Sequence, residues 1–250
     1  MAEDIKCDLD NIYSYFDGLM EKFIANRDTY DNSGNKRDIF CFYLIDYFGK
    51  NNPPKIVSSD DFSKIPSEVL YHGFVKYDHA ANFIWDHTYH YGEGIRGCGF
   101  YTTTDYDEAL DYTFSCKSPL PFKIKSDSVV KLEELDFIKL ALLSNTESEA
   151  IKNVLGEEKF KKYNALIDFV NQKIDGKYFL GYFTSNTSSL AAYLGFDAII
   201  EEYKSKPCKH VIVLNRGALV VRDKDFESFM QNASDKYKVN SSNYVLDEKR

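Results

Sequence analysis

The stretch of residues 70–112 constrains the fold of this chain more than any other part of it. Two short apolar runs there each bring polar side chains to an expected strand end. The first is followed by His72 and Gly73, and the second ends at Tyr101 and three threonines. Four glycines lie between the runs, and a short helix that carries Tyr112 is expected after them. Because glycine lets a ligand or its phosphates approach the backbone closely, the stretch predicts a ligand site.

The rest of the chain alternates between helical and strand patterns. Apolar residues at spacings of three and four predict an amphipathic helix near the N-terminus, and short apolar runs in the last third predict buried strands. Ser188 or Ser189 is expected to cap a helix that ends at Gly195. The expected helices are residues 8–24, 38–48, 78–85, 107–114, 147–154, 159–174 and 190–194. The expected strands are residues 69–74, 122–124, 129–132, 178–183, 197–201, 211–214 and 218–221.

Composition excludes several classes of protein. A net charge of -8 argues against a broad nucleic-acid-binding surface, although a local basic patch is compatible with it. No apolar run is long enough to span a membrane, and the acidic N-terminus lacks the apolar core of a signal peptide. Five cysteines without close pairing indicate reduced thiols. We expect a cytoplasmic protein with no membrane partner; delivery into another cell as an effector would leave no recognisable mark.

Three short motifs within residues 70–112 resemble those of a known family. They are Tyr71-His72-Gly73, Gly99-x-Tyr101 and Ala109-x-x-Tyr112. Their order and spacing resemble the His-Tyr-Glu class of ADP-ribosyltransferases, which includes the diphtheria-toxin and poly(ADP-ribose) polymerase groups. A later run, LAAYLGFDAII followed by HVIVLNRGALVV, is similar to the closing strands of bacterial and phage ADP-ribosyltransferase domains.

The resemblance implies a fold and a division of the chain. The fold would be α+β, a split pair of small, mostly antiparallel sheets with flanking helices. Residues 1–55 would form an N-terminal helical cap and residues 56–222 the ADP-ribosyltransferase-like core. A helical insertion is expected at about residues 136–174, and residues 223–250 would form a C-terminal tail.

The resemblance also implies how NAD would bind. His72 would contact the nicotinamide-side ribose, and the backbone of Gly73 would hold the carboxamide. Tyr101 and Tyr112 would stack on the two faces of the nicotinamide ring. Thr102 would add a hydroxyl at the pocket edge. In a chain with 19 tyrosines, both rings could instead be core aromatics, and the threonine could be an ordinary strand residue.

The catalytic glutamate of the family is missing from its usual place. The family carries it just before or at the start of a late strand, where this chain has Lys209 and His210. The nearest carboxylates in sequence are Glu201 and Glu202. Either Glu201 bends into the site or His210 replaces it, and we take both as catalytic candidates beside Tyr101. Members of the family without the glutamate tend to transfer single ADP-ribose units.

Basic residues offer two candidate anion sites. Arg96 lies among the loop glycines, where a bidentate guanidinium suits a pyrophosphate. A second basic cluster could hold a dinucleotide or an anionic acceptor, or could simply be a solvated surface. Its members are Lys204, Lys206, Lys209, His210 and Arg216.

Three rival chemistries are weaker. Residues 78–90 hold several histidines and aspartates, but the spacing of His87 and His90 aligns two metal ligands poorly on a helix, so no metal is expected. Cys98 is a conceivable nucleophile, yet nothing nearby in sequence would lower its pKa. The Gly-x-Ser-x-Gly elbow of hydrolases is absent, and the glycine loop does not open a helix as a Rossmann fingerprint does.

The resemblance therefore implies an NAD-consuming mono-ADP-ribosyltransferase. NAD would be a substrate, nicotinamide would be released, and ADP-ribose would pass to a macromolecular acceptor, either a protein or a nucleic acid. The resemblance implies a bacterial or phage toxin or effector with an inhibitor or antitoxin as a further partner. Two alternatives stay open: an NAD glycohydrolase, and a catalytically inactive NAD-binding or interaction module on the same fold.

Overall fold

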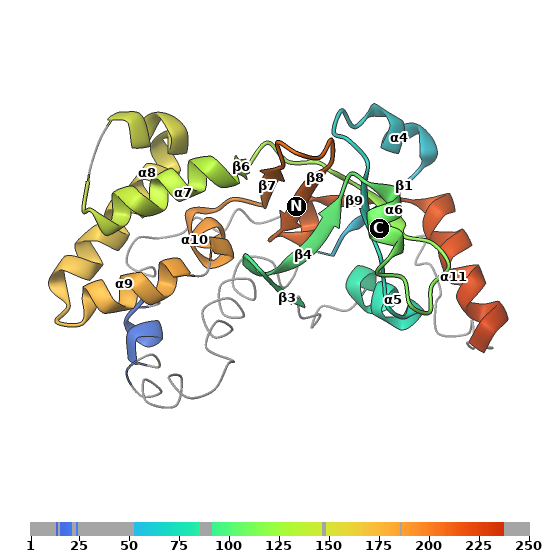
Figure 1. The fold of residues 1–250 in the computed structure, drawn as a ribbon, viewed down its shortest axis with the longest axis horizontal. Coiled ribbons are helices and arrows are strands. Elements are labelled where there is room, and N and C mark those ends of the chain that lie inside the picture. The colour runs from blue at the N-terminus through green and yellow to red at the C-terminus, as the bar shows by residue number, and fades with distance from the viewer. Residues whose placement is uncertain are drawn as a thin grey trace.

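The structure, a computed structural model, describes residues 53–85, 92–146, 149–185 and 187–237, with residues 14, 16–21 and 24 near the N-terminus. Within them the chain forms a mixed α+β fold with one curled sheet, in agreement with the predicted class (Figure 1). The helix predicted over residues 38–48 lies outside the described residues, as do His87 and His90.

One sheet joins all the described strands. Its order is β1-β9-β5-β2-β4-β8-β7-β6, and β3 forms a hairpin with β4 beside this path. Among these strands, only the outermost pairs, β1 with β9 and β6 with β7, run parallel. The strands are β1 (Lys55–Val57), β2 (Leu70–His72), β3 (Gly92–Gly94), β4 (Gly97–Thr103), β5 (Leu120–Ile124), β6 (Val129–Lys131), β7 (Ala198–Glu202), β8 (Lys209–Val213) and β9 (Leu219–Arg222).

The middle of the sheet is its weakest junction. Strands β2 and β4 share a single register pair, Tyr71 with Thr103, whereas β4 pairs with β8 over four residues. The two strands diverge beyond this pair, so His72 and Tyr101 lie at a break in the ladder rather than inside a continuous one. Such a break exposes backbone and side chains to a ligand, and it occurs where the sequence predicts the site.

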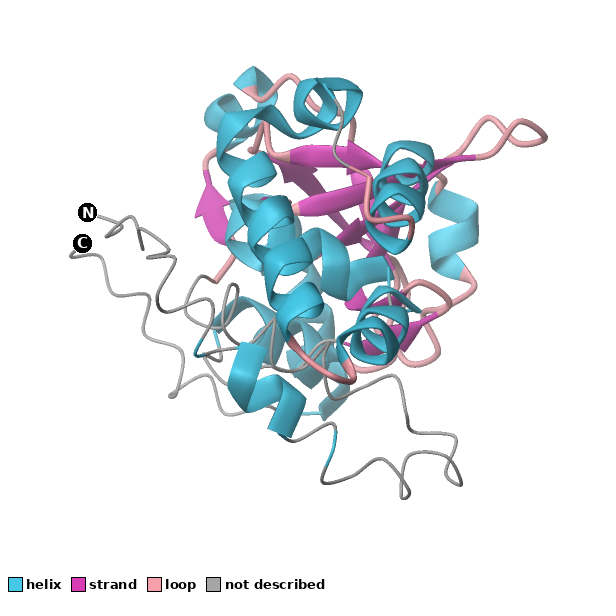
Figure 2. Cartoon of the chain, turned by 90° about the vertical axis from the view of Figure 1, so that its left-hand side faces the viewer, coloured by secondary structure: helices cyan, strands magenta, loops and turns pink. Residues whose placement is uncertain are grey.

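Helices cover both faces of the sheet (Figure 2). Helices α7 to α10 form a layer at one side, and α5 and α11 lie at the other (Figure 1). None of the described helices is both long and apolar enough to cross a membrane. The helices are α4 (Ser59–Lys64), α5 (Tyr77–Trp85), α6 (Tyr106–Leu110), α7 (Leu132–Leu143), α8 (Glu149–Gln172), α9 (Gly176–Ser185), α10 (Thr187–Leu194), the 3-10 turn η1 (Arg216–Ala218) and α11 (Asp223–Tyr237).

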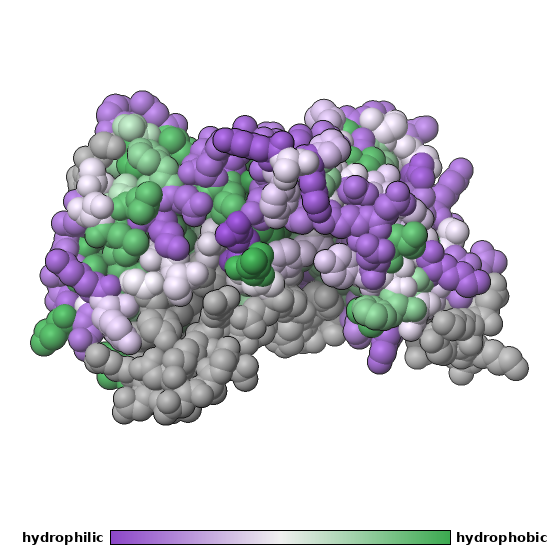
Figure 3. Space-filling model, viewed as in Figure 1, coloured by the Kyte–Doolittle hydropathy of each residue, from purple (hydrophilic) through white to green (hydrophobic). Residues whose placement is uncertain are grey.

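Two apolar cores lie on opposite faces of the sheet because strand side chains alternate in direction. Phe100 of β4 packs in the core with α5 and α11, whereas its neighbour Tyr101 packs against the core of α7 to α10. Val213 and Ile212 of β8 divide in the same way. On the described part of the face in Figure 3, polar and apolar side chains are mixed, and apolar ones gather over α7 and α8.

One predicted strand is wrong. Residues 178–183, an aromatic run, form most of helix α9. Phe179, Leu180 and Phe183 fall on one helical face, and all three are buried in the core of α7 to α10. Phe179 and Phe183 stack with ring centroids 5.8 Å apart. Tertiary packing of this face decides the helix, because β-propensity mainly measures how a side chain fits a half-buried surface.

Two predicted helix ends are also wrong. The helix expected over residues 107–114 is α6, which ends at Leu110, so Tyr112 lies in the following turn. Helix α10 begins at Thr187, so Ser188 and Ser189 are buried helical residues rather than caps. The cap predicted at the other end is present: Gly195 has a φ of 92°, which glycine adopts without strain.

Candidate active site

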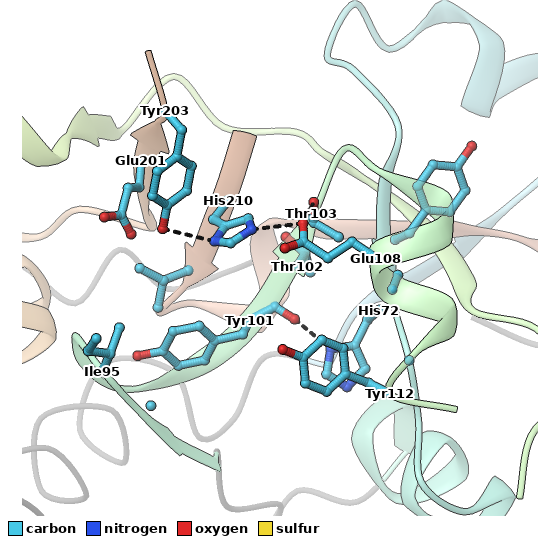
Figure 4. Close-up of a pocket in the computed structure, with 15 residues that line it drawn as sticks. His72, Ile95, Tyr101, Thr102, Thr103, Glu108, Tyr112, Glu201, Tyr203 and His210 are labelled. Carbon is cyan, nitrogen blue, oxygen red and sulfur yellow. Dashed lines mark hydrogen bonds and ion pairs between the residues drawn. The ribbon is translucent and has the colours of Figure 1, made fainter. Parts of the chain in front are cut away.

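A cavity of about 440 Å³ lies where β2 and β4 part (Figure 4). This volume falls in the usual range for small-molecule sites, roughly 300–1,000 Å³. Strands β2, β4, β7 and β8 and the turn after α6 all contribute to its wall. It is lined by Tyr71, His72, Gly73, Gly94, Ile95, Tyr101, Thr102, Thr103, Glu108, Ala109, Tyr112, Glu201, Tyr203, His210 and Ile212. All the site residues predicted from sequence are among them except Arg96.

His72 is held as a neutral imidazole. Its Nδ1 lies 2.6 Å from the carbonyl oxygen of Tyr101, and its ring packs 4.1 Å from the ring of Phe100. Burial lowers the pKa of His72 to about 4, although the hydrogen bond to Tyr101 opposes that change. A carbonyl oxygen can only accept a hydrogen bond, so Nδ1 carries the proton and Nε2 keeps a free lone pair. His72 can therefore accept a hydrogen bond from a hydroxyl group.

Gly73 is required by space rather than by backbone conformation. A Cβ at this position would lie 2.2 Å from the carbonyl oxygen of Ala109 and 2.9 Å from the Cβ of Tyr112. The end of β2 thus lies directly against the turn that follows α6. This contact places the ring of Tyr112 at the cavity, where it is 63% exposed and has a face available to a ligand.

The ring of Tyr101 forms a flat part of the cavity wall, and its hydroxyl both donates and accepts a hydrogen bond. The hydroxyl donates to the carbonyl oxygen of Gly97 at 2.7 Å and accepts from the backbone N–H of Arg96 at 3.1 Å. The ring crosses the β3–β4 hairpin at Gly94, where a Cβ would lie 2.2 Å from it. A ring so fixed loses little freedom when a planar ligand stacks on it.

Arg96 pairs with Glu201 instead of facing the cavity as a free cation. The guanidinium contacts both carboxylate oxygens of Glu201, through Nη2 and, at 3.5 Å, through Nε. The carbonyl oxygen of Arg96 accepts from the N–H and the hydroxyl of Ser188, both at 3.1 Å. The hairpin turn is thereby tied to α10 as well as to β7, and Glu201 is held in a fixed orientation at the cavity wall.

His210 and Glu201 lie side by side on the same wall. They are directly paired in the antiparallel register of β7 and β8, so their side chains share one face. Both residues were predicted as site candidates because they lie near strand ends in the sequence, and both line the cavity in the structure. The alternatives between which the sequence could not choose are thus neighbours in one site.

A hydrogen-bonded chain runs through His210 (Figure 4). Its Nε2 lies 2.8 Å from the Oε2 of Glu108, which also accepts from the hydroxyl of Thr103 at 2.9 Å. Its Nδ1 lies 3.2 Å from the hydroxyl of Tyr203. Burial acts to raise the pKa of Glu108, but the hydrogen bonds from His210 and Thr103 outweigh it, and the net pKa is lowered.

The ionised Glu108 decides the tautomer of His210. A carboxylate can only accept, so Nε2 carries the proton and Nδ1 is left to accept from the hydroxyl of Tyr203. The pKa of that hydroxyl is raised by burial and by the nearby carboxylate of Glu201, so Tyr203 keeps its proton at neutral pH. His210 thus has the arrangement of a general base whose orientation is set by a carboxylate.

Sequence reasoning missed Glu108 and Tyr203. A local signal existed for both. Asp105 caps α6 by accepting from the backbone N–H of Asp107 and Glu108, which directs the first turn of the helix toward the strand end. Tyr203 is two residues after Glu201, and such neighbours in an extended chain point to the same side.

Thr102 lines the cavity, but its hydroxyl donates to the carbonyl oxygen of Val211 at 2.8 Å. Cys98 is fully buried among apolar side chains and does not line the cavity. Neither the hydroxyl of Thr102 nor the thiol of Cys98 is placed to react with a ligand in the cavity.

The predicted basic cluster does not converge. Arg216 is 1% exposed and donates to the carbonyl oxygen of Phe83 near the end of α5, so its role is structural. Lys209 pairs with Glu68 at 2.9 Å on the opposite side of β8 from His210. The structure therefore does not assemble these residues into one anion site.

Comparisons with family models, with curated proteins and with solved structures found no match to this chain. Function is therefore inferred from the cavity and its chemistry.

Proposed function

We propose that this chain is a mono-ADP-ribosyltransferase that cleaves NAD, releases nicotinamide and transfers ADP-ribose to a macromolecular acceptor. One observation supports it above the others: residues separated by more than a hundred positions line a single cavity and offer complementary groups. These are a neutral histidine, a glycine backbone, two tyrosine rings and a carboxylate beside a histidine base, namely His72, Gly73, Tyr101, Tyr112, Glu201 and His210. An ADP-ribosyltransferase-like fold, in which the sheet is weakest between β2 and β4, is part of the same proposal.

The nicotinamide end of NAD would lie between Tyr101 and Tyr112. Stacking on aromatic rings contributes roughly 0.5–1.5 kcal/mol beyond burial and holds the leaving ring in line. The free Nε2 of His72 would accept from a ribose hydroxyl, and the backbone of Gly73 would pair with the carboxamide. All four residues line the cavity.

Cleavage of the glycosidic bond would place positive charge on the ribose. The carboxylate of Glu201, oriented by Arg96, would stabilise this oxocarbenium-like state. The bond from ribose C1′ to the nicotinamide nitrogen breaks and its electron pair leaves with nicotinamide. The acceptor atom then bonds to C1′, and its proton passes to Nδ1 of His210, directly or through the hydroxyl of Tyr203.

Labelled NAD incubated with the protein and a cell lysate tests the proposal. Label that survives nuclease but not protease would identify a protein acceptor, and the reverse pattern a nucleic acid. Nicotinamide release without labelling of either would indicate a glycohydrolase. An absence of NAD consumption in several lysates would contradict the enzyme and leave a binding module.

A matched pair of histidine variants tests the assigned base. His210→Gln should lower the rate of NAD consumption by roughly 10²- to 10⁴-fold, the usual contribution of a general base. His79→Gln, at an exposed position of α5, should leave the rate unchanged. Equal rates for the wild type and His210→Gln would remove His210 from the mechanism.

A further inference from the structure

A second group of potential ligand atoms lies behind His210. Glu108, Cys208 and His210 each offer one donor atom, and the three atoms lie within 4.8 Å of one another. They stand where the active-site cavity meets a second cavity of about 470 Å³. The second cavity is lined by Asp105, Asp107, Glu108, Asp111, Tyr112, Lys206, Pro207 and Cys208.

The backbone places these three residues together. Cys208 directly precedes β8 and His210 lies two positions later within it, so an extended chain directs both side chains to the same side. Glu108 reaches the same point from α6 and already contacts Nε2 of His210 at 2.8 Å. Cys208 is a free thiol that is only 6% exposed.

The chemistry of this donor set matches zinc. We propose that Glu108, Cys208 and His210 bind one zinc ion, with the second cavity supplying the open fourth position. Zinc takes thiolate, imidazole and carboxylate ligands tetrahedrally, which requires donor atoms roughly 3.4–3.6 Å apart, so only small side-chain movements are needed. The thiolate and carboxylate together balance the charge of the ion.

The surroundings also fit a metal. A zinc-bound histidine usually donates its other ring N–H to an oxygen, and the hydroxyl of Tyr203 stands 3.2 Å from Nδ1 of His210 to receive it. The carboxylates of Asp105, Asp107 and Asp111 line the approach. The ammonium group of Lys206 lies 3.9 Å from Oε1 of Glu108 and would repel a bound cation. Its side chain is 60% exposed, however, and is free to turn into solvent.

Zinc at this point would switch the active site off. The metal would occupy Nε2 of His210, the proton would move to Nδ1, and the imidazole could no longer accept a proton from the acceptor. This regulatory consequence rests on the proposed function, whereas the binding of the metal does not.

Cobalt(II) titration of the full chain tests the binding, since a cobalt–thiolate bond gives a charge-transfer absorption band. The wild type should show this band with one cobalt per chain, and zinc should displace it. Cys116→Ser, at another buried cysteine, should keep the band, whereas Cys208→Ser should lose it. Glu108→Gln, which keeps the shape of the side chain, should weaken binding more than about tenfold. Absence of the band in the wild type, or its persistence in Cys208→Ser, would overturn the proposal.

Inhibition tests the consequence separately. Zinc should slow NAD consumption by the wild type, a chelator should restore it, and Cys208→Ser should be less inhibited relative to its own zinc-free rate. If the chain consumes no NAD, the proposed function fails while the cobalt titration still decides the metal site. Cobalt binding without any zinc inhibition would overturn the switch alone.

Discussion

The imidazole of His72 is kept neutral by its surroundings, and this has a consequence for stability. Because burial lowers its pKa from 6.5 to about 4, the unfolded chain takes up the proton before the folded chain does. The free energy of unfolding should therefore decrease as the pH falls from 6.5 to about 4, and this histidine should add no further change below that range. Above pH 6.5 the imidazole is neutral in both states.

We expect this residue to account for a loss on the order of 2 kcal/mol between about pH 7 and about pH 4.5. Urea unfolding of the wild type and of His72→Gln at the two pH values measures it, because the glutamine variant should show a smaller loss by that amount. His79→Gln should behave as the wild type. A full pH slope in His72→Gln would mean that the imidazole is not buried as described.

At the scale of elements, the approach of β2 to α6 depends on Gly73. Gly73→Ala would put a methyl group against the backbone of Ala109 and against Tyr112. Overpacking of this kind costs roughly 1–3 kcal/mol, or the turn moves and takes the ring of Tyr112 with it. We expect a lower free energy of unfolding, weaker NAD binding, or both.

Gly181→Ala is the matched control. Gly181 lies inside α9 with open space where its Cβ would be, so alanine should be neutral or stabilise by roughly 0.5–1 kcal/mol. Thermal unfolding and NAD titration of both variants measure the two effects. Wild-type stability and NAD affinity in Gly73→Ala would show that the contact does not shape the site.

For the whole molecule, α11 closes the core on one face of the sheet. Phe229 on this helix is 3% exposed and lies 5.0 Å from the ring of Tyr77 and 6.0 Å from that of Phe74. Helix α11 and the segment that follows β2 thus share one core. Loss of the packing of α11 would therefore destabilise β2 and the site next to it.

Phe229→Ala should lower the free energy of unfolding by about 3 kcal/mol, as large-to-small changes in cores do. Phe114→Ala, at a position 81% exposed, should change it by no more than about 0.5 kcal/mol. Denaturant unfolding measures the free energy of unfolding of both variants. Equal stability of the two variants would show that α11 is not packed on the core.

The local part of this architecture could be predicted from the sequence. Strands β2, β7, β8 and β9 lie where short apolar runs indicated them, because burial on both faces of a strand leaves that pattern. Helix α9 could not be distinguished, since an aromatic run suits a strand equally until its neighbours exist. Only the packing of Phe179 and Phe183 against the other helices decides it.

The same division holds at the site. The sequence alone determined which short motifs carry polar groups at strand ends, including His72, because such spacing is a property of neighbouring residues. Tertiary structure decided the partners. Arg96 meets Glu201 across 105 positions, and Glu108 meets His210 across 102. Such contacts follow from the order of strands in the sheet, which no local pattern specifies, so the contact between Glu108 and His210 and the cavity that both line emerge only in the folded chain.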